Sequence, residues 1–350
     1  MRANIKEALL SMLANTDFIV IKAAATCVAA IAVIELPAGQ WPLFIETLTK
    51  NAESQDLNVR LASIQTLGFI CEDIDPASIN PVDMNSILFA VLSNIIPQEL
   101  TLARIAMKAF ARAAPITTKN FPDVGQKNFI MQKMFEAGNI EDEEVLTSLM
   151  EAMNDIVRVN YDYMYEFIET IGNLTMKLIS SEHEKPATLA VEVWTTLADV
   201  ELQRKQKNGN CLNIISGCYE SIIQIIFQGF GKFEMSTQDE ALDEMPENNI
   251  SISAGLTLES ISRVAGNLVL QPVLDFIHPK LSSANWGDRY IGMIAFGSII
   301  DGPDPNQICS IIAEAYSAII EMINDPVPKV RQTVSFVFYK LSEFVPQLIF

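Results

Sequence analysis

The chain has 350 residues, 49% of them apolar, and its 43 acidic and 24 basic residues give a formal net charge of −19. Such a surface repels nucleic-acid phosphates and anionic lipids, so we expect no nucleic-acid partner. We also expect no membrane insertion, because residues 18–36 are interrupted by Lys22 and the unbroken apolar run after it is too short to span a bilayer. The charge suits a basic protein or peptide as partner.

Apolar residues recur at mixed spacings of three and four along most of the chain, which is the pattern of amphipathic helices. Few segments show strand or hairpin signals, so the sequence predicts an all-α fold. Taken in order, the predicted helix pairs occupy residues 1–34, 41–74, 86–115, 127–159, 164–200, 212–264, 273–302 and 304–346.

The last of these segments shows the repeating unit most clearly. Its two helices are separated by Asp325, a predicted N-cap, and by Pro326, at a position where a missing N–H costs nothing. Two such helices cannot bury both apolar stripes against each other and need a similar pair on each side. We therefore expect an α-solenoid of about eight HEAT-type helix pairs, forming a single domain over residues 1–350.

An arginine recurs near the start of several predicted second helices. Arg60, Arg289 and Arg331 occupy this position, and the last two are 42 residues apart, within the roughly 40–47 residues of a HEAT repeat. These arginines either form a ladder that ties neighbouring repeats together or lie solvated on the surface. The sequence favours neither interpretation.

The sixth predicted pair, residues 211–267, carries an insertion at residues 232–249. Insertions in solenoid repeats lie in loops on one face, which is often the binding face. A charge-dense loop can also be plain solvated surface, but its position within a solenoid favours binding. The acidic residues of this loop are Glu234, Asp239, Glu240, Asp243, Glu244 and Glu247.

Nothing in the sequence indicates catalysis, a metal or a cofactor. The two histidines, His183 and His278, lie in different predicted repeats and have no nucleophile or metal-ligand spacing around them. The five cysteines are odd in number, mostly in apolar helical runs, and are typical of reduced thiols in an intracellular protein. We therefore predict that the chain is not an enzyme.

Several short strings resemble the importin-β subfamily of karyopherins. They are GQWPLFI at residues 39–45, GFICEDIDP at 68–76, NFIMQ at 128–132, AFGSIIDGPDPNQ at 295–307 and DPVPKVRQT at 325–333. The acidic insertion falls where the family carries its acidic loop. The resemblance covers essentially the whole chain and implies the third to tenth repeats of a solenoid about twice as long, with both ends missing.

The resemblance implies a nuclear transport receptor of the cytoplasm, nucleus and nuclear pore. Its expected partners are phenylalanine-glycine nucleoporins, the basic arm of importin-α or basic cargo, and Ran-GTP. Ran-GTP binding is expected to be weakened, because its first contact area in the family lies largely in the two preceding repeats. The alternative is a HEAT scaffold or adaptor, such as a phosphatase or vesicle-coat subunit.

The family's nucleoporin pocket lies on the outer face, between first helices of adjacent repeats. The matching positions here are Leu88, Phe89 and Leu92 on one helix, Phe129 and Ile130 on the next, and Phe167 for a second pocket, with Thr175 in place of an apolar residue. On the inner face, Trp286 and Phe336 match positions where the family stacks the basic arm. The acidic loop is implied to bind the importin-α arm or Ran.

Overall fold

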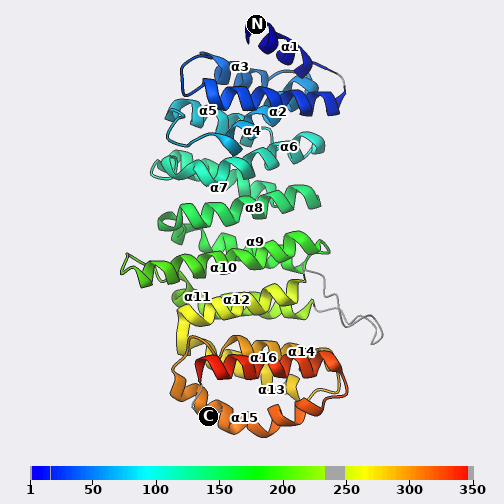
Figure 1. The fold of residues 1–350 in the computed structure, drawn as a ribbon, viewed down its shortest axis with the longest axis vertical. Helices are drawn as coiled ribbons and strands as arrows, with labels where there is room; N and C mark the ends of the chain where they lie inside the picture. Colours follow the sequence, from blue (N-terminus) through cyan, green and yellow to red (C-terminus); the bar gives the residue numbers. More distant parts are fainter. Residues whose placement is uncertain (1, 16, 233–248, 346–350) are drawn as a thin grey trace. The chain divides into compact units, whose positions relative to one another are not determined.

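The structure is a computed structural model that describes residues 2–15, 17–232 and 249–345. The described residues form α-helices and short 3-10 helices and contain no strand, which confirms the predicted all-α class. They divide into two compact units, Met1–Tyr163 and Met164–Phe350. Figure 1 shows that within each unit the helices follow one another as antiparallel pairs. The single domain over residues 1–350 stays a prediction.

In the first unit, four helix pairs stack so that the second helix of each pair contacts the second helix of the next, and first helices likewise contact first helices. The second helices form one layer, in which α2 contacts α4, α4 contacts α6 and α6 contacts α8, and the first helices α3, α5 and α7 form the other. The helices are α1 (Arg2–Leu13), α2 (Phe18–Glu35), α3 (Phe44–Asn51), α4 (Leu57–Asp73), α5 (Pro81–Ser93), α6 (Leu100–Ala113), α7 (Val124–Ala137) and α8 (Glu143–Val159).

The second unit repeats this arrangement. The second helices α10, α12, α14 and α16 contact one another in order, and the first helices α9, α11 and α13 do the same. The helices are α9 (Ile168–Ser180), α10 (Glu184–Gln206), α11 (Ile214–Gly231), α12 (Ile250–Ala265), α13 (Leu270–Leu281), α14 (Trp286–Ser298), α15 (Pro305–Glu321) and α16 (Pro328–Phe344). These pairs agree with the predicted ones.

Close contact between second helices depends on small residues at some positions. Gly68 of α4 faces Ala109 of α6 so closely that a Cβ at residue 68 would lie 2.7 Å from the Ala109 Cβ. The neighbouring apolar side chains, such as Leu67 and Ala106, are fully buried between the repeats. Burial at about 25 cal/mol per Å² of apolar surface is the main force that holds successive pairs together.

An arginine near the start of a second helix reaches the start of the second helix in the next repeat. Arg60 of α4 bonds Glu99 at 2.7 Å, Arg104 of α6 bonds Asp142 at 2.7 Å, and Arg289 of α14 bonds Asp325 at 2.6 Å. The ladder interpretation is thus confirmed for Arg60 and Arg289. Arg104 and Asp142 form a further step that the sequence analysis did not find.

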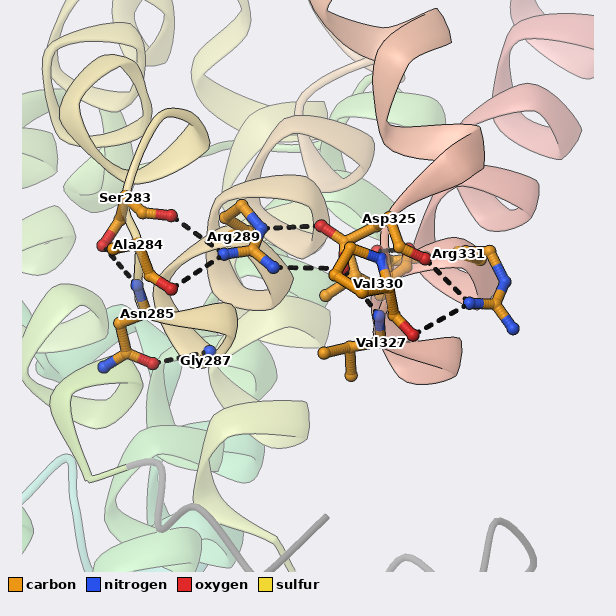
Figure 2. Close-up of polar contacts among 11 residues, drawn as sticks. Ser283, Ala284, Asn285, Gly287, Arg289, Asp325, Val327, Val330 and Arg331 are labelled. Atoms are coloured by element: carbon orange, nitrogen blue, oxygen red, sulfur yellow. Dashed lines mark hydrogen bonds and ion pairs between the residues drawn. The ribbon is translucent and has the colours of Figure 1, made fainter.

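The step at Arg289 is the most completely formed of these contacts (Figure 2). The Arg289 Nη1 donates to the carbonyls of Ser283 and Ala284 at 2.9 and 3.1 Å, while Nε and Nη2 both bond the Asp325 carboxylate. The same carboxylate accepts the Val327 N–H at 2.8 Å in the turn before α16. The N-cap residue of α16 is Val327, with Pro328 at the first helical position, so the helix begins two residues later than the predicted Asp325 cap. Burial alone would raise the pKa of Asp325, but these hydrogen bonds hold that pKa below its ordinary value.

Helix α2 differs from the other second helices because only Lys22, Thr26 and Glu35 interrupt its apolar residues. By length and composition it could cross a bilayer, a property that core helices share. One face, which includes Ile21, Ala25 and Val28, is buried against α1 and α4. The opposite face is exposed and includes Ile19 and Ile34, which are 77% and 75% exposed.

The ladder predicts a charge-dependent loss of stability in Asp325→Asn. Asparagine can still accept the Val327 N–H, so the variant removes mainly the charge. We expect the free energy of unfolding to fall by about 1–3 kcal/mol at pH 7. Since the folded pKa of Asp325 is lowered, its stabilising effect is present above the unfolded pKa of about 4 and is lost as the pH falls through the folded value. Urea unfolding at pH 7 and near pH 2 measures the difference, which should shrink at the lower pH. An equal loss of unfolding free energy at both pH values would show that the charge of Asp325 is not responsible.

Candidate functional site

Two aromatic rings meet on the surface of the first-helix layer of the first unit. Phe89 of α5 and Phe129 of α7 stack with their centroids 5.4 Å apart and their planes 21° apart. Phe89 is 56% exposed and Phe129 is half-buried. We name these two side chains the aromatic pair.

Local capping fixes the helices that carry the aromatic pair. Helix α5 begins after Asn80, whose side chain accepts the Asp83 N–H, and has Pro81 at its first position. Helix α7 begins after Asp123, whose carboxylate accepts the Gln126 N–H at 2.9 Å. Because α5 and α7 pack side by side, each helix brings one phenylalanine to their shared outer surface.

The other predicted residues of this pocket point into the core. Leu88 is 3% exposed, Leu92 is fully buried and Ile130 is 1% exposed. The expectation that Leu92 lies open to a ligand on an exposed helix is therefore wrong. The physical reason is that residues 88 and 92 share the face of α5 that packs inward, whereas residue 89 lies about 100° further round the helix.

Phe167, predicted to line a second pocket, belongs to the second unit. It lies in a short 3-10 helix, Tyr165–Phe167, just before α9, and is half-buried beside the 65% exposed Tyr165. Thr175 is fully buried and accepts a hydrogen bond from the Trp194 indole at 3.2 Å. The threonine at this position is therefore a core partner of Trp194 rather than part of a surface.

The two predicted inner-face aromatics are both half-buried, and Phe336 lines a cavity. Trp286 starts α14 and contacts Tyr290 edge-on, with ring centroids 6.3 Å apart. Phe336 of α16 lines a cavity of about 350 Å³ in the second-helix layer of the second unit. Tyr290 also lines this cavity, and burial raises its pKa to about 12, so its hydroxyl stays protonated.

The cavity is mostly apolar, with one charged group in its wall. Its lining residues come from α12, α14 and α16 and include Ile252, Leu256, Glu259, Ile294 and Gln332. Glu259 accepts the Lys340 ammonium at 2.7 Å and also pairs with Arg263, which in turn bonds Asp301. Glu259 is therefore neutralised locally, and an apolar or aromatic side chain is the ligand group that this cavity fits.

The six predicted acidic residues of the inserted loop all lie outside the described residues. The structure describes only its two flanks. Helix α11 ends at Gly231, and α12 begins at Ile250, where the Asn249 side chain caps it by accepting the Ser251 N–H at 2.8 Å. The insertion therefore joins the first and second helices of the sixth pair, as expected. Its role as a binding loop stays a prediction.

No group of three or more metal-ligating side chains comes together in the part of the chain that the structure describes. His183 is the residue before α10, and His278 lies in the last turn of α13. The described residues bring apolar side chains together at two places, the aromatic pair and the cavity.

Paired helices in two layers, tied by an arginine ladder, define an α-solenoid of HEAT repeats. No family model matches the chain. It is 30% identical over 354 residues to "Importin subunit beta-1" of Saccharomyces cerevisiae, an alignment that covers 99% of the chain and 41% of the relative. The chain thus spans about two fifths of the length of this curated relative.

Solved structures give the same result. The structure titled "Kap95:Nup1 complex" superposes on the chain with a TM-score of 0.89 at 28% sequence identity. A structure of Kap95p with RanGDP superposes with a TM-score of 0.89 at 27% sequence identity. Each superposition covers 99% of this chain and 41% of the Kap95p chain. Kap95p is yeast importin-β. The chain is a homologue of importin-β, which confirms the predicted resemblance and fold. Importin-β subunits are transport receptors, so the prediction of a non-enzymatic protein is confirmed as well.

The burial of Leu92 predicts that Leu92→Asp and Phe89→Asp will behave differently. A lone carboxylate in the core costs several kcal/mol, so Leu92→Asp should unfold the first unit or lower its melting temperature strongly. Phe89→Asp places its charge in solvent and should change stability by about 0.5 kcal/mol or less beyond the loss of ring stacking. Circular dichroism melts of both variants measure this, and equal melting temperatures would contradict the burial of Leu92.

Proposed function

We propose that this chain acts in nuclear transport and binds phenylalanine-glycine nucleoporins through the aromatic pair. The observation that carries the proposal is the stacking of Phe89 on Phe129 at the surface between two first helices. Exposed aromatic rings in contact are unusual on a soluble surface and indicate a binding site for apolar side chains. The relative Kap95p is seen in complex with Nup1, which supports a nucleoporin as the partner.

The strength of such a contact suits passage through a pore. A phenylalanine ring that packs against the aromatic pair gains roughly 1.5–3 kcal/mol of apolar burial before the cost of ordering the peptide. Single contacts of this size are weak and break quickly. Many repeats on one nucleoporin can still hold the receptor through their number.

The second proposed partner is a basic segment, such as the importin-α arm or a basic cargo. The net charge of −19 supports attraction of such a segment over a long range. The inserted acidic loop supplies carboxylates between α11 and α12, and the cavity beside Phe336 offers an apolar seat in the same unit. Trp286, which is half-buried at the start of α14, is proposed to stack on an arginine or lysine of the segment.

Ran is the third proposed partner, and the solved structure of Kap95p with RanGDP supports it. A receptor with these partners would work in the cytoplasm, in the nucleus and at the nuclear pore. The alternative, a phosphatase or vesicle-coat adaptor, shares the HEAT fold but is not favoured, because the similar proteins found are importins.

The nucleoporin proposal predicts that Phe89→Ser and Phe129→Ser each weaken binding of a phenylalanine-glycine peptide by about tenfold, because each removes half of the apolar contact. Tyr316→Ser is the matched control, since Tyr316 is also 56% exposed and lies on a first helix, α15. The measurement is titration of the labelled peptide by fluorescence polarisation. If all three variants bind like the parent protein, the aromatic pair is not the nucleoporin site.

The acidic-loop proposal predicts a kinetic effect. Replacement of Asp239, Glu240, Asp243 and Glu244 by Asn or Gln should slow association with a basic importin-α arm and flatten its dependence on salt, because screening acts within a Debye length of ~8 Å. Stopped-flow measurements at low and physiological salt give both quantities. Replacement of Glu143, Glu144, Glu151 and Asp155 on α8 removes equal charge elsewhere and serves as control. An unchanged association rate at low salt would remove the loop from the mechanism.

A further inference from the structure

The cavity beside Phe336 runs along α14, between the two second helices that flank it. Its floor is formed by side chains four residues apart on α14, which are Tyr290, Ile294 and Ser298. Its walls come from α12 and α16. Lys340 of α16 bonds Glu259 of α12 at 2.7 Å, and this bond closes one end of the cavity because Glu259 is the last lining residue on its helix.

Two glycines hold the walls of the cavity in place. A Cβ at Gly255 of α12 would lie 2.8 Å from the Ile294 Cγ2, and a Cβ at Gly297 of α14 would overlap the Phe336 ring. Ile294 and Phe336 are therefore each packed against the backbone of a neighbouring helix. Side chains that are fixed in this way lose little conformational entropy when a ligand binds.

The wall on α12 continues onto the surface of the second-helix layer. Ile252 is half-buried and Leu256 is 58% exposed, although both line the cavity. An exposed leucine that borders an apolar cavity gives a ligand additional apolar area to cover. With a volume of about 350 Å³, the cavity has room for one leucine or phenylalanine side chain.

A carboxylate that lacks a cation lies on the opposite side of α12. Glu192 of α10 is half-buried and accepts a hydrogen bond from the Ser253 hydroxyl of α12 at 3.4 Å. No lysine or arginine within the described part of the chain pairs with Glu192, and burial raises the pKa of its carboxyl. Glu259, in contrast, is paired with Lys340 and Arg263. Glu192 is thus the carboxylate beside the cavity that the cation of a ligand can neutralise.

The position of Glu192 sets the spacing that a ligand needs. Helix α12 packs between α10 and α14, and the axes of packed helices are about 8–10 Å apart. An extended peptide advances about 3.3 Å per residue. A lysine or arginine about two to four residues from an apolar residue can therefore reach Glu192 while the apolar side chain lies in the cavity.

We propose that the second-helix layer of the second unit binds an extended segment with two recognition groups. A leucine or phenylalanine of the segment enters the cavity, and a lysine or arginine about two to four residues away bonds Glu192. This inference rests on the basic segment proposed above as a partner, and it adds an apolar anchor at a defined spacing. The anchor distinguishes one basic segment from another, because attraction by net charge alone does not.

The test uses fluorescence polarisation of short labelled peptides titrated with the chain. The parent peptide has a serine and glycine background, one leucine, a lysine three residues from it, and further lysines at its far end. Two other peptides change the leucine to serine or the neighbouring lysine to glutamine. We expect each change to weaken binding about tenfold, because each removes one of the two recognition groups.

Two variants of the chain identify the contacts. Glu192→Gln keeps an acceptor for Ser253 and removes the charge, so it should weaken binding of the parent peptide about tenfold and leave the lysine-to-glutamine peptide unaffected. Leu256→Ser removes part of the cavity wall and should weaken binding of the parent peptide about fivefold, with no effect on the leucine-free peptide. A change that acted only on the fold would weaken all three peptides alike.

The matched controls are Glu314→Gln and Leu268→Ser, which change exposed side chains of the same kinds in the same unit, away from the cavity. Both should bind the parent peptide as the unchanged chain does. Equal binding of the parent and leucine-free peptides would overturn the apolar anchor and leave the basic-segment proposal standing. If none of the lysine-bearing peptides binds, both proposals fail. Uniform weakening of all three peptides by Glu192→Gln or Leu256→Ser would also overturn the inference.

Discussion

The fold depends on one constraint. A single helix pair of this kind cannot bury the apolar side of its second helix and needs a neighbouring pair to cover it. Apolar packing between α4 and α6, or between α14 and α16, satisfies this constraint and supplies most of the stabilisation. The arginine ladder adds a polar contact at a fixed place in this packing, because Arg60 and Arg289 each bond a carboxylate at the start of the following second helix. Both partners of the Arg289 step are largely buried, so this bond is shielded from salt more than a surface pair would be.

The same constraint separates two kinds of surface. The layer of first helices is free to carry exposed apolar side chains such as Phe89, because the second helices already close the core between repeats. The layer of second helices carries the cavity beside Phe336 and the polar network at Glu259. In the function proposed above, the first-helix layer of the first unit binds the nucleoporin and the second-helix layer of the second unit binds the basic segment.

Much of the fold follows from the sequence, because helix periodicity and the arginine spacing are local patterns. The pairs and the break at the inserted loop were predictable. The recurrence of Arg60 and Arg289 was visible too, but not whether these arginines tie neighbouring repeats or lie solvated on the surface. The bond between Arg104 and Asp142 was not predictable, because the two residues are 38 positions apart and the acidic residues beside Asp142 indicate only the start of a helix. For the site, the sequence placed Phe89 and Phe129 on adjacent helices, but Leu92 was expected at the surface. Which of two neighbouring apolar residues points outward depends on the packing partner, and no single-sequence pattern specifies it.

One bond in the second unit skips a repeat. Lys340 of α16 donates to Glu259 of α12 at 2.7 Å, although α14 packs between these helices in the order of contacts. In an array coupled only through nearest neighbours, the terminal pair frays without direct effect on the pair two steps away. Here the opening of α16 takes a cation away from Glu259 and leaves that carboxylate with Arg263. This bond therefore couples α16 directly to α12, in addition to the coupling that runs through α14.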